Sequence, residues 1–303
     1  MRIIALLSLL CAALPLSAAT FDKPPDEFDL FGYEQRVQAK HEDTLVGIAR
    51  AHGIGQEEIL RANQALDRWL PGEGTEVFIP SRYIVPRAQR SGLVLNLPEM
   101  RLYYDPKPED GESAQVQTYP VSIGRMDWAT PLGATRIVRK QKDPAWYPPE
   151  SIRKEHAEKG DPLPRVVPPG PDNPLGQYAL RLGIPGYLIH GTNKALGVGM
   201  RVSHGCIRML PEDIEVLFPQ LPKGTKVEII NQPVKAGWYG GKLYLEVHPP
   251  LDEYPGDPDT INRMVTAVLA EVLSRREAEL DEEAIDAEIF RQSGIPVVIS
   301  LDS

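Results

Sequence analysis

The chain is organised around residues 190–208, which read His-Gly-Thr-Asn-Lys-Ala-Leu-Gly-Val-Gly-Met-Arg-Val-Ser-His-Gly-Cys-Ile-Arg. This stretch contains two of the six histidines and one of the two cysteines of the chain. The other cysteine, Cys11, lies in an apolar leader, so Cys206 is expected to be the one thiol of the mature chain. An exported chain that keeps a single thiol, with no partner for a disulfide, indicates a cysteine retained for its reactivity.

A cysteine nucleophile needs a base or a positive environment, because an ordinary thiol is only slightly ionised at neutral pH. His190 and His204 are the two candidates. His190 is favoured, since the base usually reaches in from a neighbouring strand, whereas His204 and Cys206 would diverge in a tight glycine turn. Gly205, directly before the thiol, would let the backbone approach a substrate and present N–H groups to a developing oxyanion.

Two other interpretations of these residues remain open. A free cysteine is often a small buried hydrophobe, and a lone histidine is more often structural than catalytic. His190, His204 and Cys206 could also bind zinc, since these residue types are its common ligands. A fourth ligand and a Cys-x-x-Cys pair are not evident in the sequence, so the chemistry of the residues favours a nucleophile over a metal site.

The motif can be compared with known families through its residues and its spacing. It consists of His190-Gly191-Thr192 and, with the cysteine sixteen positions after the histidine, Ser203-His204-Gly205-Cys206-Ile207-Arg208. This pattern resembles the signature of the L,D-transpeptidase catalytic domain, the YkuD-type domain.

The resemblance implies a role for each residue of the motif. Cys206 would be the nucleophile and His190 the base, while Ser203, His204 and Gly205 would orient the base and line the oxyanion site. The resemblance also places three residues at the substrate: Arg208, Gly191 and Thr192. The planar guanidinium of Arg208 suits a substrate carboxylate. No metal and no cofactor are implied.

Composition and charge narrow the class of protein. The 303 residues, of which 25% are charged, are typical of a globular chain of two or three domains. A formal net charge of −9 argues against nucleic acid or an anionic membrane surface as partner. Residues 1–19 resemble a secretory signal peptide, with Arg2, an apolar run and a small-residue cleavage site. The apolar run is too short for a membrane anchor, so we expect an exported, periplasmic chain without a transmembrane segment.

A linker is expected over residues 20–34 and a small module over residues 35–82. The module's pattern predicts a strand, two helices and a strand, with Asp43 or Thr44 as cap and Gly53 as stop of the first helix. This βααβ order resembles the glycan-binding LysM module. The matching residues are Asp43-Thr44-Leu45, Ile48-Ala49, Gly53, Ala62-Asn63, Pro71-Gly72 and Ile79-Pro80. The alternative is a structural domain that packs on the catalytic one.

Residues 91–231 are expected to form the catalytic domain. Period-two patterns predict a hairpin near its start and further strands up to residue 230, which indicates a mainly β fold. The resemblance implies that this fold is a β-sandwich-like YkuD domain, in which Thr130-Pro131-Leu132-Gly133 matches an early structural turn. Residues 143–174 contain nine prolines and little periodicity, so they predict an irregular, lid-like loop over the His190 and Cys206 pocket.

Residues 235–303 predict a small α+β region. A hairpin turns at Gly240 and Gly241, an apolar helical stripe starts at Ile261, and a second helix and a strand follow. His248 is expected in a loop. This region suggests packing and no function of its own.

Leader, module and thiol motif together predict an exported peptidoglycan L,D-transpeptidase. The resemblance implies that Cys206 forms a thioester on the diamino acid of a tetrapeptide stem with loss of D-Ala. The acyl group would then pass to an amine, either another stem in a 3-3 cross-link or the C-terminal lysine of an outer-membrane lipoprotein. Two alternatives are a hydrolase with the same site, an L,D-carboxypeptidase or murein-lipoprotein endopeptidase, and a non-catalytic murein-binding protein.

Overall fold

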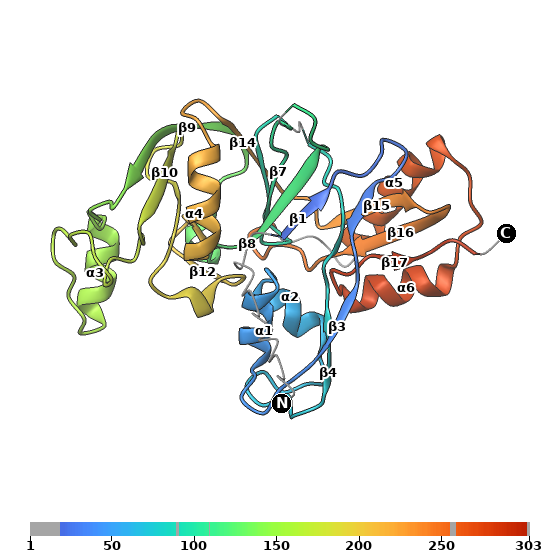
Figure 1. Cartoon of the computed structure of the whole chain (residues 1–303), viewed down its shortest axis with the longest axis horizontal. Coiled ribbons are helices and arrows are strands. Elements are labelled where there is room, and N and C mark those ends of the chain that lie inside the picture. The colour runs from blue at the N-terminus through green and yellow to red at the C-terminus, as the bar shows by residue number, and fades with distance from the viewer. Residues whose placement is uncertain (1–18, 89–90, 109, 255–258, 302–303) are drawn as a thin grey trace, which may run out of the picture.

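The structure is a computed structural model that describes residues 19–88, 91–108, 110–254 and 259–301. A central β domain carries the βααβ module below it and the C-terminal region at one side (Figure 1). The expected signal peptide lies outside the described residues except for Ala19, which begins the first strand. Across these four ranges, no helix combines the length and the apolar character needed to cross a bilayer.

One large sheet forms the central domain. Its strands are β1 (Ala19–Asp22), β6 (Leu93–Asn96), β7 (Arg101–Tyr104), β8 (Gln115–Gly124), β9 (Gly133–Lys142), β10 (Tyr178–Leu182), β11 (Leu188–His190), β12 (Arg201–Ser203), β13 (Ile207–Met209) and β14 (Lys226–Ile230). The order is β1-β8-β13-β11-β10-β9-β14-β6-β7, with β12 beside β8. Because β7 also pairs with β8, the sheet bends round and closes on itself. The mainly β, sandwich-like fold expected from the sequence is confirmed.

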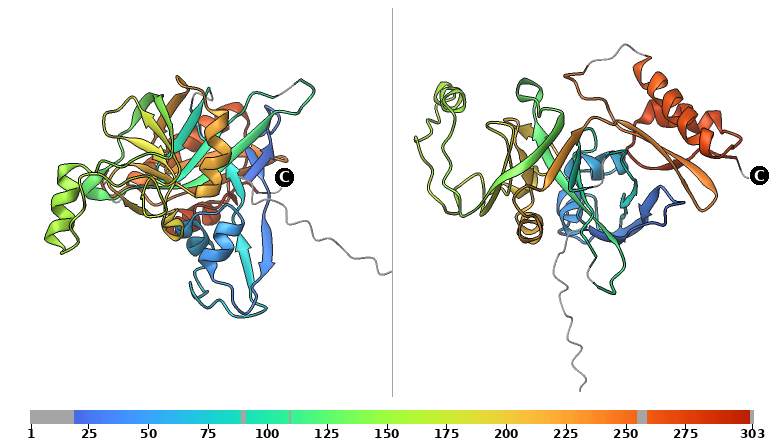
Figure 2. Two further views of the ribbon diagram at one scale, coloured as in Figure 1. Left: turned by 60° about the vertical axis from the view of Figure 1, so that its left-hand side comes forward. Right: turned by 90° about the horizontal axis from the view of Figure 1, so that it is seen from above.

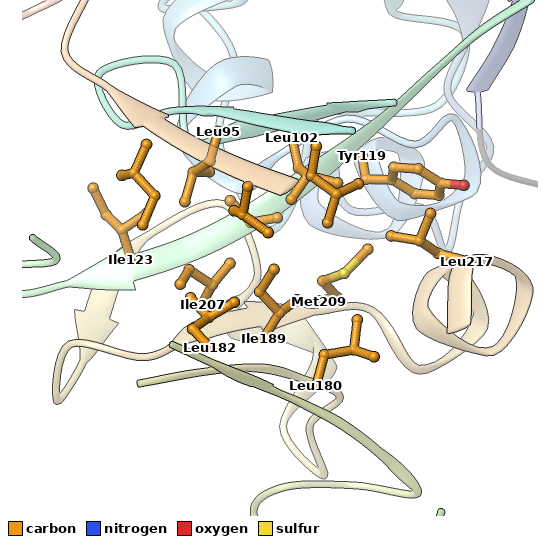
Figure 3. Packing of buried hydrophobic residues seen from close by; sticks show 14 of the residues in the cluster. Leu95, Leu102, Tyr119, Ile123, Leu180, Leu182, Ile189, Ile207, Met209 and Leu217 are labelled. Atoms are coloured by element: carbon orange, nitrogen blue, oxygen red, sulfur yellow. The ribbon is translucent and has the colours of Figure 1, made fainter. Parts of the chain in front are cut away.

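The facing parts of this bent sheet enclose one apolar core (Figure 3). Helix α4 (Pro211–Gln220) covers one end of the core with Ile214 and Leu217. Strands β11 and β13 run parallel, and their buried Ile189 and Ile207 are partners in register. Since side chains alternate along a strand, the residues that follow these two isoleucines point to the opposite face, away from the core.

The small module has the expected βααβ order, with β3 (Gln35–Gln38), α1 (Leu45–Ala51), α2 (Gln56–Ala62) and β4 (Glu76–Ile79) around its own core. Thr44 caps α1, because its hydroxyl accepts a hydrogen bond from the Gly47 N–H at 2.9 Å. Gly53 follows α1 with a φ of +65°, a conformation that suits glycine.

The stretch expected to be a linker is instead part of the folded structure. Within residues 20–34, β1 pairs with β8, and β2 (Leu30–Gly32) pairs with β5 (Arg82–Ile84). Phe21 and Phe31 lie against Tyr83 with ring centroids 6.3 and 5.5 Å away. Strands of three or four residues are too short to show an alternating pattern of apolar residues in the sequence. The aromatic side chains that order them pack against residues far away in the chain.

The C-terminal region pairs β15 (Val234–Tyr239), β16 (Lys242–Val247) and β17 (Val297–Val298) under α5 (Thr260–Arg275) and α6 (Glu282–Arg291). A buried ionic cluster, formed by Glu99, Lys235, Glu246 and His248, joins it to the central domain. His248 lies in a loop as expected, but it is 4% exposed and its Nε2 is 2.6 Å from Glu246 Oε1.

The proline-rich segment 143–174 is not wholly irregular. It contains α3 (Glu150–Glu158) and a β-bridge between Trp146 and Val167, and in two views it extends outward from one end of the central domain (Figures 1 and 2). The helix arises because prolines flank residues 150–158 but do not interrupt them, with Pro149 at the N-cap.

Candidate active site

Cys206 lies at the end of a tight turn between β12 and β13. The buried hydroxyl of Ser203 holds this turn from inside: it donates to Cys206 O at 2.5 Å and accepts from the Gly205 N–H at 3.1 Å. Gly205 has a φ of +96°, and a Cβ there would lie 2.9 Å from the Tyr187 ring. The turn therefore requires glycine before the thiol. In this structure the Gly205 N–H donates to Ser203, and the expected oxyanion role of Gly205 stays a prediction.

A second side chain supports the turn from the loop between β8 and β9. The Thr130 hydroxyl donates to Gly205 O at 2.9 Å and accepts from the Gly124 N–H at 3.1 Å. A Cβ at Gly124 would lie 3.0 Å from Gly205 Cα, so the end of β8 and the catalytic turn are in close backbone contact. Thr130 thus has the structural role that the sequence suggested, and the thiol stands on a rigid support.

His190 ends β11 on the face that points away from the apolar core. Its Nδ1 is 2.6 Å from Gly191 O, which places the ring proton on Nδ1 and leaves Nε2 as the basic nitrogen. Burial lowers the pKa of His190 to about 4, with a further lowering by Arg208, against the carbonyls of Gly191 and Leu175. The imidazole is therefore neutral, and able to accept a proton, throughout the neutral range.

The thiol comes from the segment that leads into the strand next to His190, and its Sγ is 3.6 Å from Gly186 O. His190 is the register partner of Arg208, and Cys206 precedes Arg208 by two positions. Burial raises the pKa of Cys206, while the Leu188 N–H and the charge of Arg208 act in the opposite direction. At rest Cys206 is therefore a neutral thiol and His190 a neutral imidazole. The thiol has to give up its proton when the sulfur attacks.

The guanidinium of Arg208 has no ion pair or hydrogen bond in the part of the chain that the structure describes. Its guanidinium is partly buried, and burial lowers the pKa of Arg208 against the raising effect of Cys206. A half-buried cation without an anion is costly, because its desolvation is not offset. The site therefore presents one uncompensated positive charge next to the nucleophile.

His204 points away from the thiol, toward the proline-rich segment. Its Nε2 is 3.1 Å from Glu155 Oε2 of α3, and its ring meets Trp128 edge-on at 5.3 Å. Nη2 of Arg125 donates to both oxygens of the same Glu155 carboxylate, at 2.7 and 2.8 Å. Hydrogen bonds from Arg125, then Lys159, lower the pKa of Glu155 to about 2. His204 therefore ties α3 to the catalytic turn.

Gly191 and Thr192 are buried beneath the end of the proline-rich segment. A Cβ at Gly176 would lie 2.8 Å from the Thr192 N atom, and the Thr192 hydroxyl accepts from the Lys194 N–H at 3.0 Å. These contacts shape the loop after His190. The Thr192 hydroxyl accepts in this contact and keeps its own O–H as a donor, so the expected substrate contact stays a prediction.

The zinc alternative finds no support in the arrangement. Within the described ranges, the potential ligand atoms of His190, His204 and Cys206 do not gather as those of a cation site would. The group that does gather is Glu99, Glu246 and His248, within 4.8 Å of one another. Lys235 Nζ pairs with both carboxylates there, so an ammonium already supplies the cation.

Several residues of the site were not singled out from the sequence. Glu155, Arg125, Trp128 and Leu175 lie next to the motif only in the folded chain. The density of prolines over residues 143–174 marked the segment that carries one of them, Glu155, but no local signal distinguishes Glu155 from the other acidic residues of α3. Its partner His204 is 49 positions away along the chain.

Comparison with known proteins agrees with this geometry. The YkuD family model, the L,D-transpeptidase catalytic domain, matches residues 90–229. The probable L,D-transpeptidase ErfK/SrfK of Escherichia coli K12 is 39% identical over 303 residues, which cover 98% of this chain and 96% of that protein. The probable L,D-transpeptidase YbiS of the same strain is 38% identical, covering 93% and 92%.

A similar solved structure is the catalytic domain of the L,D-transpeptidase of E. faecium. It is 21% identical, with a TM-score of 0.35, and the match covers 48% of this chain and 100% of that one. Sequence identity of 38% and 39% to the two Escherichia coli proteins, over nearly the full length of each chain, identifies the family. The chain belongs to the L,D-transpeptidases.

Proposed function

We propose that this chain is an exported L,D-transpeptidase that acts on peptidoglycan tetrapeptide stems with Cys206 as nucleophile and His190 as base. The observation that carries the proposal is the pairing of β11 with β13, which sets His190 opposite the unpaired Arg208, with Cys206 directly before β13 and its pKa lowered by the charge of Arg208. A nucleophile, a base and a cation on one rigid surface suit acyl transfer from a peptide that bears carboxylates.

In the first half-reaction the Cys206 sulfur attacks the carbonyl of the stem's diamino acid while its proton passes to Nε2 of His190. The tetrahedral intermediate then breaks its C–N bond, and His190 returns the proton to the departing D-Ala amine. The product is a thioester on Cys206. The pKa of about 4 at His190 suits both proton transfers. The neutral imidazole is available as base, and its protonated form is a strong acid toward the departing amine.

In the second half-reaction an acceptor amine attacks the thioester carbonyl and gives a proton to His190. The C–S bond breaks, and the thiol is restored with that proton. The acceptor is a second stem or the C-terminal lysine of an outer-membrane lipoprotein, in keeping with the resemblance. Arg208 holds a carboxylate of the donor stem, since a planar guanidinium next to the thiol can bind both of its oxygens.

The proline-rich segment is the proposed lid that selects the acceptor. Within this segment Glu155 holds His204, and the backbone carbonyl of Leu175, directly after the segment, accepts a hydrogen bond from His190. A shortened segment that retains residues 173–176 should therefore alter the choice of acceptor more than the rate of acylation. Equal losses of both activities, or no loss of either, would contradict this role.

The βααβ module is the proposed glycan-binding part. Its loop between α2 and β4 exposes Trp69 by 53% and Leu70 by 76%, and Asp67 holds both of their N–H groups at 2.8 Å. An ordered, exposed aromatic side chain is typical of a binding surface. Trp69→Ala should weaken sedimentation with purified peptidoglycan sacculi, whereas Tyr33→Ala, at another exposed aromatic, should not.

Intact mass spectrometry tests the proposed chemistry. The purified mature chain and Cys206→Ala are each mixed with disaccharide-tetrapeptide and no acceptor. An adduct equal to the stem minus D-Ala, seen only with the thiol present, would establish the acyl-enzyme. Release of D-Ala without a lasting adduct would favour the hydrolase, and neither product would favour a murein-binding protein.

A further inference from the structure

The βααβ module is in direct contact with the loop that connects the proposed base to the proposed nucleophile. The N–H groups of Gln56 and Glu57, at the start of α2, donate to Val198 O at 3.2 Å and to Gly199 O at 3.1 Å. Val198 and Gly199 lie between His190 and Cys206 in the sequence. The module therefore shares backbone hydrogen bonds with the catalytic loop itself.

The junction leaves no room for a side chain. A Cβ at Gly199 would lie 2.3 Å from Gln56 N and 2.4 Å from Gly55 Cα, and Gly199 has a φ of +85°. A Cβ at Gly55 would in turn lie 3.1 Å from Gly199 Cα. Two glycines thus let the two backbones touch, and either segment can shift only if the other shifts with it.

The module is anchored to the central domain independently of this loop. Arg50 of α1 forms a two-pronged pair with Glu212 at the start of α4, at 2.7 and 3.0 Å. Arg101 of β7, which is buried, holds Glu58 of α2 at 2.5 Å and Gly53 O at 3.2 Å. These contacts fix α1 and α2 relative to the sheet, so α2 offers the loop a stationary reference point.

From Gly199 a short chain of contacts leads to the thiol. The Ile123 N–H donates to Met200 O at 3.3 Å, and the Arg125 N–H donates to Ser203 O at 3.1 Å. Ser203 then holds the turn through Cys206 O and the Gly205 N–H. Between Gly199 and Ser203 lie only Met200 and the first two residues of β12.

We propose that the start of α2 is a positioning element for catalysis, which holds the Val198–Gly199 segment and through it the Ser203–Cys206 turn. In this proposal, which rests on the proposed role of Cys206, the βααβ module contributes to the reactivity of the thiol in addition to any glycan that it binds. Gln56, Glu57 and Gly199 are positioning residues, because none of them touches the reacting atoms.

The test compares Gly199→Ala with Gly197→Ala in the full chain. Gly197 lies in the same loop, and a Cβ there would meet no atom within 4 Å. Two rates are measured for each variant: acylation of Cys206 by disaccharide-tetrapeptide, and alkylation of Cys206 by iodoacetamide as a function of pH. Thermal unfolding and sedimentation with sacculi report on folding and on the module.

Gly199→Ala should acylate about tenfold more slowly or worse, because a small misplacement of a nucleophile is expensive. Its alkylation profile should move to lower pH, since burial is what raises the pKa of Cys206 and a displaced turn is more open. Gly197→Ala should match the wild type in both rates. A Gly199→Ala variant with wild-type acylation and an unchanged alkylation profile would overturn the proposal.

A second pair of variants guards against a folding defect in Gly199→Ala. Gln56→Pro removes the N–H that donates to Val198, and Gly55 already has the φ of −71° and ψ of 154° that suit a residue before proline. Gln56→Ala removes the same side chain but keeps the N–H. Gln56→Pro should acylate about fivefold more slowly than Gln56→Ala, and equal rates would contradict the proposal.

The two readouts also separate this proposal from the proposed function. If the wild type forms no acyl-enzyme but the alkylation profiles differ as expected, the substrate assignment fails and the positioning role stands. If the wild type is acylated and all variants behave alike, the positioning role fails and the transpeptidase assignment stands.

Discussion

His190 and His248 are two buried histidines at the ends of strands, and burial lowers the pKa of both. Their surroundings differ in what is left unpaired. His248 lies in the buried ionic cluster, where Lys235 pairs with both Glu99 and Glu246. His190 lies beside a free thiol and Arg208, whose charge has no anion among the described residues.

The difference shows that burial and a shifted pKa do not by themselves define an active site. In the buried ionic cluster each carboxylate has Lys235 as its cation, and these pairs join the C-terminal region to the central domain. Around His190 the compensation is missing, and a substrate carboxylate can provide it. The two sites should therefore respond in opposite ways to substitution: one in activity, the other in stability.

The largest effect is expected for the base itself. His190→Gln should reduce the rate of acyl-enzyme formation about a thousandfold, because the sulfur loses the group that takes its proton. His248→Gln should leave the rate per folded molecule unchanged. Intact-mass kinetics with disaccharide-tetrapeptide measure both variants. Equal losses in the two would remove the functional distinction between the histidines.

The next effect concerns the free energy of unfolding. Lys235→Met leaves Glu99 and Glu246 buried without their cation, which should cost about 3 kcal/mol or more. Arg208→Met should cost little or nothing, since no pair is broken. Urea titration followed by circular dichroism measures this difference. If Arg208→Met is the less stable variant, the contrast between the two sites is wrong.

Arg208→Met should instead lower kcat/KM for acylation by roughly tenfold to a hundredfold, the usual loss of a charge-assisted hydrogen bond to substrate. Arg208→Lys should recover part of the activity, because it restores the charge without the planar fork. Donor titrations under steady-state conditions give the values. A donor whose carboxylates are amidated should be insensitive to the substitution, and undiminished sensitivity would argue against a carboxylate contact.

The dependence on pH gives a smaller but directional test. The acid limb of kcat/KM should lie near pH 4, where His190 becomes protonated. In Arg208→Met this limb should move to higher pH, because the charge of Arg208 lowers the pKa of His190. The alkylation profile of Cys206 should also move to higher pH, since Arg208 lowers the thiol's pKa. A shift of either curve to lower pH would contradict the assigned neighbours.

The same titration affects stability with a defined sign. An unfolded histidine binds its proton below about pH 6.5, whereas folded His190 remains neutral down to about pH 4. Between these values the unfolded chain binds more protons, so the free energy of unfolding decreases as the pH falls. His190→Gln should flatten this decrease in the chemical unfolding curves. An unchanged slope would mean that other groups account for it.

The smallest effect is expected at Glu155. Glu155→Gln keeps the shape of the side chain but removes the charge that faces Arg125 and His204. Acylation should slow about threefold, because the interaction is partly exposed and screened. Lys154→Gln, next to it on α3 and 78% exposed, is the control. A thousandfold loss in Glu155→Gln would mean that His204 takes part in proton transfer.

Local signals in the sequence were sufficient for the order of elements and for the central motif. Residues close together in the chain determine three such features: the hairpin of β6 and β7, the Thr44 cap at the start of α1, and the strand β14. The same holds for the spacing between His190 and Cys206, because the motif is contiguous and its glycine is required by the turn. These features rest on periodicity, capping and backbone conformation, which short segments carry by themselves.

Only the tertiary structure decided which distant groups meet. The ion pair of Glu155 with His204, the contact of α2 with Gly199 and the cluster around Lys235 each join residues far apart in the chain. Such contacts depend on the closure of the sheet and on the packing of three cores against one another. A charge or a glycine looks the same in sequence whether it faces water, a buried partner or a passing backbone, and only the fold distinguishes the three.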